Sequence, residues 1–114
     1  MNFLPASANG AELAIQAAAA PIPVPSLGGK VVEVGVRPEH LALCGPDDAD
    51  FSGEIELLER LGAETFAYVR VPGLDQNLTL RLSDRRGPDV GSAVNLRIDR
   101  ANLHLFGESA RVPA

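Results

Sequence analysis

Few side chains in this chain have the types and spacing that chemistry requires. His40 and Cys44 are four residues apart and could face each other if a helix spanned them. Two such groups do not complete a structural metal site, which usually has four ligands. Cys44 is also the only cysteine, so the sequence offers no intramolecular disulfide. We therefore expect no metal here, with His40 covering the end of a barrel and Cys44 filling a small apolar space.

The residues that cleave nucleotides or act as acid and base are not in place. Lys30 follows two glycines, but Val31 stands where a phosphate-binding loop needs a hydroxyl. Glu54, Glu56 and Glu59 could in principle supply a general acid and a base. The alternation of Glu54 with Glu56 instead favours a solvated strand face. We therefore predict that the chain is not an enzyme, with no catalytic residue and no cofactor of its own.

The elements that would have to position functional groups are short strands. Apolar and polar side chains alternate along residues 32–36, 78–82 and 94–98, which is typical of strands with one face on a core. The phase slips between Leu57 and Leu58, which predicts a bulge or a sharp coil of the strand. Many short strands separated by glycine and proline turns predict an all-β barrel or sandwich.

Helices are expected only as single turns. One is predicted at Glu39 to Leu43 and another at Arg100 to Asn102, where Asp99 can cap the turn. Pro72 and Gly73 fit the two central positions of a type II turn. No stretch has a long period of about 3.6 residues, so we predict no long helix.

Residues 1–30 are expected to form a strand pair and a proline-rich loop. Asn9 and Gly10 give a turn signal between two short stretches that could pair. The alternating prolines of residues 21–25 exclude a central strand. One domain would span residues 1–114, made of this first part, a main barrel over residues 31–107 and a tail over residues 108–114.

Composition excludes several classes of partner. The net charge is −5, the pI is about 4.9 and aromatic residues make up 4% of the chain, so nucleic acid is not an expected partner. No apolar run approaches the roughly 20 residues of a membrane-spanning helix. The single cysteine fits a reducing compartment. The cytoplasm is therefore the expected location.

One motif carries a family resemblance. Residues 34–43 spell V-G-V-R-P-E-H-L-A-L, which resembles the signature of the C-terminal regulatory region in ATP-binding subunits of carbohydrate ABC importers of the maltose and glycerol-phosphate type. This region is the TOBE, or oligonucleotide-binding-like, domain. The resemblance extends over about residues 31–107 and continues through the segments at 53–56, 59–65, 77–81, 90–91 and 104–106.

The resemblance implies a fold and a function. The fold would be a small OB-fold-like Greek-key barrel, and the function that of a non-catalytic regulatory and dimerisation domain. Its partners would be a second copy of the chain, the ATPase and transmembrane subunits of the importer, and a possible regulatory protein. Such a domain works in the cytoplasm, peripheral to the inner face of the cell membrane. ATP and magnesium would be bound only by an ATPase domain, which this sequence lacks.

Four residues are the candidates for a signature or interface role: Arg37, Glu39, His40 and Phe106. Pro38 starts a turn that leaves Glu39 near exposed backbone amides, where a carboxylate is stabilised. Arg37 and Glu39 would then define a rigid corner, which we expect to close the barrel rather than to contact a ligand. Phe106, on the short last strand, is a candidate contact with a partner chain, with core packing an equal alternative.

A second function remains open from the sequence. Related TOBE domains in other transport systems bind small oxyanions, which would make this chain an oxyanion-binding module. Such a site needs converging amides and cationic or hydroxyl side chains. The candidates here are Arg37, Arg81, Arg97 and Ser83.

Overall fold

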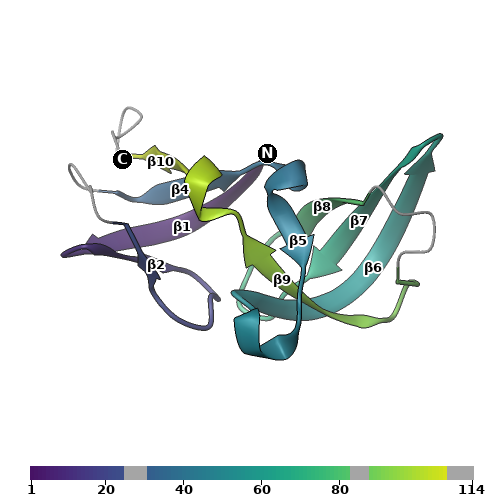
Figure 1. Ribbon diagram of the computed structural model, residues 1–114, viewed down its shortest axis with the longest axis horizontal. Coiled ribbons are helices and arrows are strands. Elements are labelled where there is room, and N and C mark those ends of the chain that lie inside the picture. Colours follow the sequence, from purple (N-terminus) through teal and green to yellow (C-terminus); the bar gives the residue numbers. More distant parts are fainter. Residues whose placement is uncertain (25–30, 83–87, 108–114) are drawn as a thin grey trace.

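A computed structural model of the 114-residue chain describes residues 1–24, 31–82 and 88–107, and within them the fold is built from strands and single 3-10 turns. The strands form two five-stranded sheets, with orders β10-β4-β1-β2-β3 and β5-β9-β6-β7-β8 (Figure 1). The bounds are β1 Asn2–Asn9, β2 Glu12–Ile15, β3 Ile22–Pro23, β4 Glu33–Val36, β5 Leu41–Leu43, β6 Phe51–Leu61, β7 Glu64–Arg70, β8 Leu78–Leu82, β9 Ala93–Ile98 and β10 His104–Phe106. The two curved sheets confirm the predicted all-β, OB-fold-like architecture.

In the first sheet, the two halves of β1 pair with different strands. Residues 2–5 of β1 pair with β4, and residues 6–9 pair with β2. Gly10, at φ +66°, closes the tight hairpin with β2 that the Asn9 and Gly10 signal predicts. The first strand pair is therefore part of the same sheet as β4 and the C-terminal β10.

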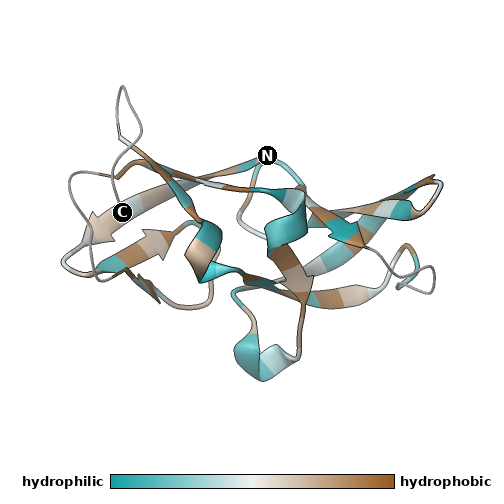
Figure 2. Cartoon of the chain, turned by 45° about the horizontal axis from the view of Figure 1, so that its top comes forward, coloured by the Kyte–Doolittle hydropathy of each residue, from teal (hydrophilic) through white to brown (hydrophobic). Residues whose placement is uncertain are grey.

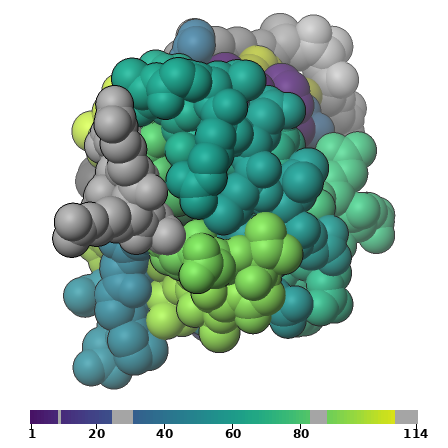
Figure 3. Space-filling model, turned by 90° about the vertical axis from the view of Figure 1, so that its right-hand side faces the viewer, coloured from purple at the N-terminus to yellow at the C-terminus, as the bar shows by residue number. Residues whose placement is uncertain are grey.

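The second sheet contains the long hairpin of β6 and β7. Its register shifts between Ile55 and Leu57, which confirms the predicted bulge one residue before the position where the apolar phase slips. Gly62, at φ +64°, makes the turn into β7. From the end of the molecule (Figure 3), this hairpin forms a broad teal surface above the green strand region of β9. Leu57 and Leu61, both more than half exposed, belong to this hairpin.

Within the described residues, three single turns of 3-10 helix connect the strands, at Pro38–His40, Pro46–Asp48 and Arg100–Asn102. The last is capped as predicted, because Asp99 Oδ1 accepts the Ala101 N–H at 3.0 Å. The prediction of a turn over Glu39 to Leu43 was wrong in its extent. The turn ends at His40, because Leu41–Leu43 pair with β9 as a strand. The second turn, at Pro46–Asp48, was not predicted.

The buried apolar residues of both sheets form one hydrophobic core, to which each of the ten described strands contributes. Figure 2 shows the apolar residues, in brown, along the strands of both sheets. The alternation predicted for the sequence is confirmed where it is clearest, since Leu78 and Leu80 are buried while Arg81 is exposed. The same holds for Val94, Leu96 and Ile98 on β9. The packed pattern is the physical reason why the strands keep their register.

Two buried polar side chains join distant parts of the fold. Asn2 Nδ2 donates to the carbonyls of Val36 and Thr79 at 3.1 and 2.9 Å, and its Oδ1 accepts the Thr79 N–H. Asn2 therefore connects β1 of the first sheet to β8 of the second. Asp50 accepts a bidentate pair of hydrogen bonds from Arg100, both at 2.8 Å.

Close packing of β6 against β7 leaves no room for a side chain at Gly53. A Cβ there would overlap the carbonyl oxygen of Arg70 and lie 2.9 Å from Val69 Cγ1. We predict that Gly53→Ala lowers the free energy of unfolding by about 1 to 3 kcal/mol, because the backbone must shift. Gly45→Ala is the control, since nothing lies within 4 Å of a Cβ at that position. Equal urea midpoints for the two variants would contradict this packing argument.

Candidate functional site

The predicted signature residues lie at a corner between β4 and β5. Pro38 occupies the first turn of the 3-10 segment, and the His40 N–H donates to the Arg37 carbonyl at 2.9 Å. The corner lies against β8. The chain turns here because proline fixes its own φ angle near the value that the turn requires. A backbone N–H at the first position of such a turn would have no partner, and proline has no such group.

Charge at the corner stabilises ionised Glu39. Its carboxylate accepts a hydrogen bond from its own backbone N–H, which lowers the pKa of this carboxyl, and the charges of His40, Arg81 and Arg37 lower it further. The Glu39 side chain is exposed. The structure thus brings Arg37, Glu39 and His40 together on one corner, in a cluster that is solvated.

His40 is half-buried, and its backbone is hydrogen-bonded to the residue that follows β9. Its carbonyl accepts the Asp99 N–H at 2.9 Å, while its buried Nδ1 has no partner in the described structure. Nearby, Cys44 is half-buried, and burial raises the pKa of its thiol. In the described part of the chain, no three His, Cys, Asp or Glu side chains group in a way that could hold a metal ion.

Phe106 lies apart from this corner, on the outer face of the first sheet. Its ring contacts that of Phe3 with 6.0 Å between centroids and a 57° tilt. A Cβ at Gly35 would lie 2.5 Å from Met1 Sδ and 3.1 Å from Phe106, so these side chains cover the glycine. Met1 and Phe3 remain 46% and 54% exposed. We call Met1, Phe3 and Phe106 the aromatic patch.

The candidate anion-binding side chains are engaged elsewhere. Arg81 forms an ion pair with Glu64 at 3.1 Å, and Arg97 Nη1 donates to the Asp48 carbonyl at 3.3 Å. Arg37 is exposed beside Glu39, and Ser83 lies outside the described residues. This geometry does not favour the oxyanion alternative, because carboxylates stand beside Arg81 and Arg37 and would repel an anion there.

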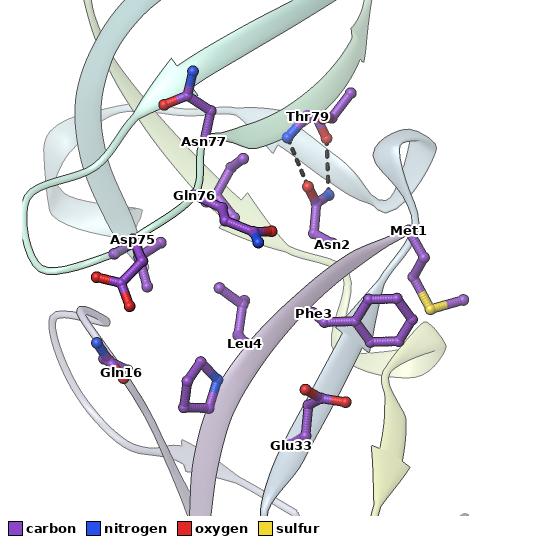
Figure 4. A pocket seen from close by; sticks show the side chains of 13 residues that line it. Met1, Asn2, Phe3, Leu4, Gln16, Glu33, Asp75, Gln76, Asn77 and Thr79 are labelled. Carbon is purple, nitrogen blue, oxygen red and sulfur yellow. Dashed lines mark hydrogen bonds between the residues drawn. The ribbon is translucent and has the colours of Figure 1, made fainter.

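A groove of about 500 Å³ lies beside the first half of β1 and was missed in the sequence. The segments lining it are residues 1–5 and 74–79, together with Gln16 and Glu33. Figure 4 places Asp75, Gln76 and Gln16 on one side of the β1 ribbon, and Phe3 and Glu33 on the other. The lining comes from four separate parts of the chain, so no local pattern in the sequence could indicate the groove. The polar segment after the Pro72 and Gly73 turn was the only hint that the sequence contained.

The described arrangement combines a charged corner, an exposed aromatic patch and a polar groove. No helix in the described segments is long and apolar enough to cross a membrane.

Comparison with known proteins agrees with this description. The chain is 36% identical to the sn-glycerol-3-phosphate import ATP-binding protein of Chromohalobacter salexigens, over 99% of the chain and 32% of that protein. It is 32% identical to the maltose/maltodextrin import ATP-binding protein of Salmonella typhi, over 95% of the chain and 32% of that protein. The chain therefore spans about a third of the length of these relatives. A family model described as the TOBE domain matches residues 34–106, and the chain belongs to this TOBE domain family.

Proposed function

We propose that this chain is a non-catalytic regulatory and dimerisation domain of an ATP-binding subunit in an ABC importer for sugars or sugar phosphates. The observation that carries the proposal is the alignment of nearly the whole chain with import ATP-binding proteins for sn-glycerol-3-phosphate and maltose or maltodextrin. Binding and cleavage of ATP would belong to the rest of such a subunit. This domain would act in the cytoplasm, at the inner face of the membrane, beside the transmembrane subunits.

The aromatic patch is the surface that we assign to pairing with a second copy. Phe3 and Phe106 already contact each other, so a partner would meet a preformed pair of rings. Aromatic side chains of this kind contribute strongly to interfaces, because they bury much area with few rotatable bonds. Because Gly35 has no side chain, the side chains of Met1 and Phe106 can lie directly against the backbone of β4.

Self-association tests this assignment. We expect sedimentation of the purified chain to show a weak dimer, and Phe3→Ser to raise its dissociation constant about tenfold, because the exposed ring is lost from the interface. Leu61→Ser is the matched control: Leu61 is 55% exposed but lies at the far end of the β6 and β7 hairpin. It should leave the constant unchanged.

Two results would count against the proposal. A strictly monomeric chain at millimolar concentration would remove the pairing role of the isolated domain. Equal weakening by Phe3→Ser and Leu61→Ser would move the interface away from the aromatic patch. Circular dichroism of both variants would verify that they remain folded.

A further inference from the structure

The aromatic patch contains a sulfur atom that solvent can reach. Met1 is the only methionine of the chain, and it is 46% exposed. Met1 lies two residues before Phe3, and alternate residues of an extended chain share a face. Figure 4 accordingly shows the Met1 sulfur, in yellow, and the Phe3 ring on the same side of the β1 ribbon. The sulfur is therefore part of the patch and accessible to a small reagent in water.

Gly35 determines where this sulfur lies. Phe3 is the residue opposite Gly35 in the pairing of β1 with β4. A Cβ at Gly35 would lie 2.5 Å from Met1 Sδ, 3.5 Å from Met1 Cγ and 3.1 Å from Phe106 Cε2. The sulfur and the edge of the Phe106 ring thus share the space above one glycine. Contacts between a thioether and the edge of an aromatic ring are favourable, so the Met1 side chain stabilises the patch.

The other sulfur atom of the chain belongs to Cys44, and its environment protects it from oxidation. Cys44 is half-buried, and burial raises the pKa of its thiol. The thiolate is the reactive form of cysteine, so this thiol reacts slowly at neutral pH. A thioether has no proton to lose, and its oxidation depends on access to the sulfur instead. Met1 is therefore the sulfur residue that an oxidant in solution meets first.

We propose that Met1 is a reversible oxidation site, and that its oxidation by a hydroperoxide opens the aromatic patch and weakens pairing with a second copy. The effect on pairing rests on the proposed function. In the reaction, the thioether sulfur attacks the terminal oxygen of the hydroperoxide, the O–O bond breaks and a sulfur–oxygen bond forms. The hydroperoxide proton moves to the departing oxygen, which leaves as an alcohol or as water. Sulfur loses two electrons and the peroxide gains them, so the product is methionine sulfoxide.

The sulfoxide disturbs the patch because its oxygen is polar. The rings of Phe3 and Phe106 offer that oxygen no hydrogen-bond donor. Burying it against a second copy would remove its hydration without compensation. Reductases specific for methionine sulfoxide restore the thioether, so the change can be reversed.

Treatment of the purified chain with hydrogen peroxide tests the site. We expect mass spectrometry to find one added oxygen atom on Met1 while Cys44 remains unmodified. In NMR spectra, the Gly35 amide and the ring signals of Phe3 and Phe106 should shift on oxidation. The two methionine sulfoxide reductases, one for each epimer, should restore them. Oxidation of Cys44 ahead of Met1, or unchanged Gly35 and ring signals after Met1 is oxidised, would overturn the proposal.

Sedimentation measures the effect on pairing. Oxidation should raise the dissociation constant of the dimer about fivefold to tenfold. The matched control is the chain in which norleucine replaces methionine. Because Met1 is the only methionine, this replacement changes one side chain and puts a methylene group in place of the sulfur. The norleucine chain should pair as the native chain does and should not respond to peroxide. An equal response of both chains would overturn the assignment to Met1.

The two measurements separate this inference from the proposed function. A native, unoxidised chain that stays monomeric at millimolar concentration would count against pairing through the patch. The NMR comparison would then still decide whether oxidation of Met1 opens the patch. A dimer with the same dissociation constant before and after oxidation would leave the pairing in place and overturn the proposed effect of oxidation.

Discussion

Arg100→Ala should lower the free energy of unfolding by about 3 to 5 kcal/mol. The Asp50 side chain is only 6% exposed, and Arg100 supplies a bidentate contact to it at 2.8 Å. After the substitution the carboxylate stays buried, with the Ile98 N–H at 2.8 Å as its remaining hydrogen bond. Loss of one partner from a buried pair is costly because the other charge is left uncompensated. Urea denaturation followed by circular dichroism would measure this change.

Arg70→Ala provides the matched control for the same substitution. Arg70 contacts Glu54 and Glu56 at 3.7 and 2.9 Å, but its side chain is 57% exposed. Solvent screens such pairs, so we expect a loss of about 0 to 1 kcal/mol. If Arg100→Ala cost no more than Arg70→Ala, the buried pair would not have the structural role assigned to it.

The backbone of Asp50 also links the two sheets. Its N–H donates to Leu96 on β9, and its carbonyl accepts from Ala19, which follows β2 of the first sheet. Asp50 thus joins both sheets at the start of β6. Disturbing this residue affects the packing between the sheets as well as one ion pair.

Local features of the fold could be predicted from the sequence because their causes are local. The Asn9 and Gly10 turn, the bulge near Leu57 and the Asp99 cap each depend on residues that are neighbours in the chain. The alternation of apolar and polar residues is also a local pattern, so it predicted which faces of β8 and β9 are buried. The extent of the turn at Glu39 was not predictable in this way, because pairing of Leu41 with Ile98 on β9 decides it.

Long-range polar contacts had no such local signal. Asp50 and Arg100 are 50 residues apart, and Asn2 and Thr79 are 77 apart. The types of these side chains do not indicate which distant residue each one will contact. The groove was missed for the same reason, since its lining comes together only when β1 lies beside residues 74–79.

The candidate site was partly predictable. The signature residues Arg37, Glu39 and His40 are contiguous with the proline that forms their corner, so their proximity followed from the turn. The contact of Phe106 with Phe3 required the sheet order, because β10 and β1 both pair with β4. The sequence could therefore place Phe106 on a short strand but could not identify the ring beside it.

The second large effect is expected at Asn2, whose side chain joins the two sheets. Asn2→Ala should lower the free energy of unfolding by about 2 to 4 kcal/mol, because it leaves the N–H and the carbonyl of Thr79 without their partner. Both groups are partly shielded from water by the surrounding strands. Thermal and urea denaturation would measure the loss.

Asn2→Asp separates hydrogen bonding from packing at the same position. The variant keeps the shape of the side chain, but an ionised carboxylate cannot donate to Val36 and Thr79, whose carbonyl oxygens lie 3.1 and 2.9 Å from the native Nδ2. We therefore expect Asn2→Asp to be at least as unstable as Asn2→Ala at neutral pH. At acidic pH the introduced carboxyl group is protonated and regains one donor, so the deficit of Asn2→Asp relative to Asn2→Ala should shrink. A deficit that does not change with pH would mean that packing, rather than hydrogen bonding, makes Asn2 important for joining the sheets.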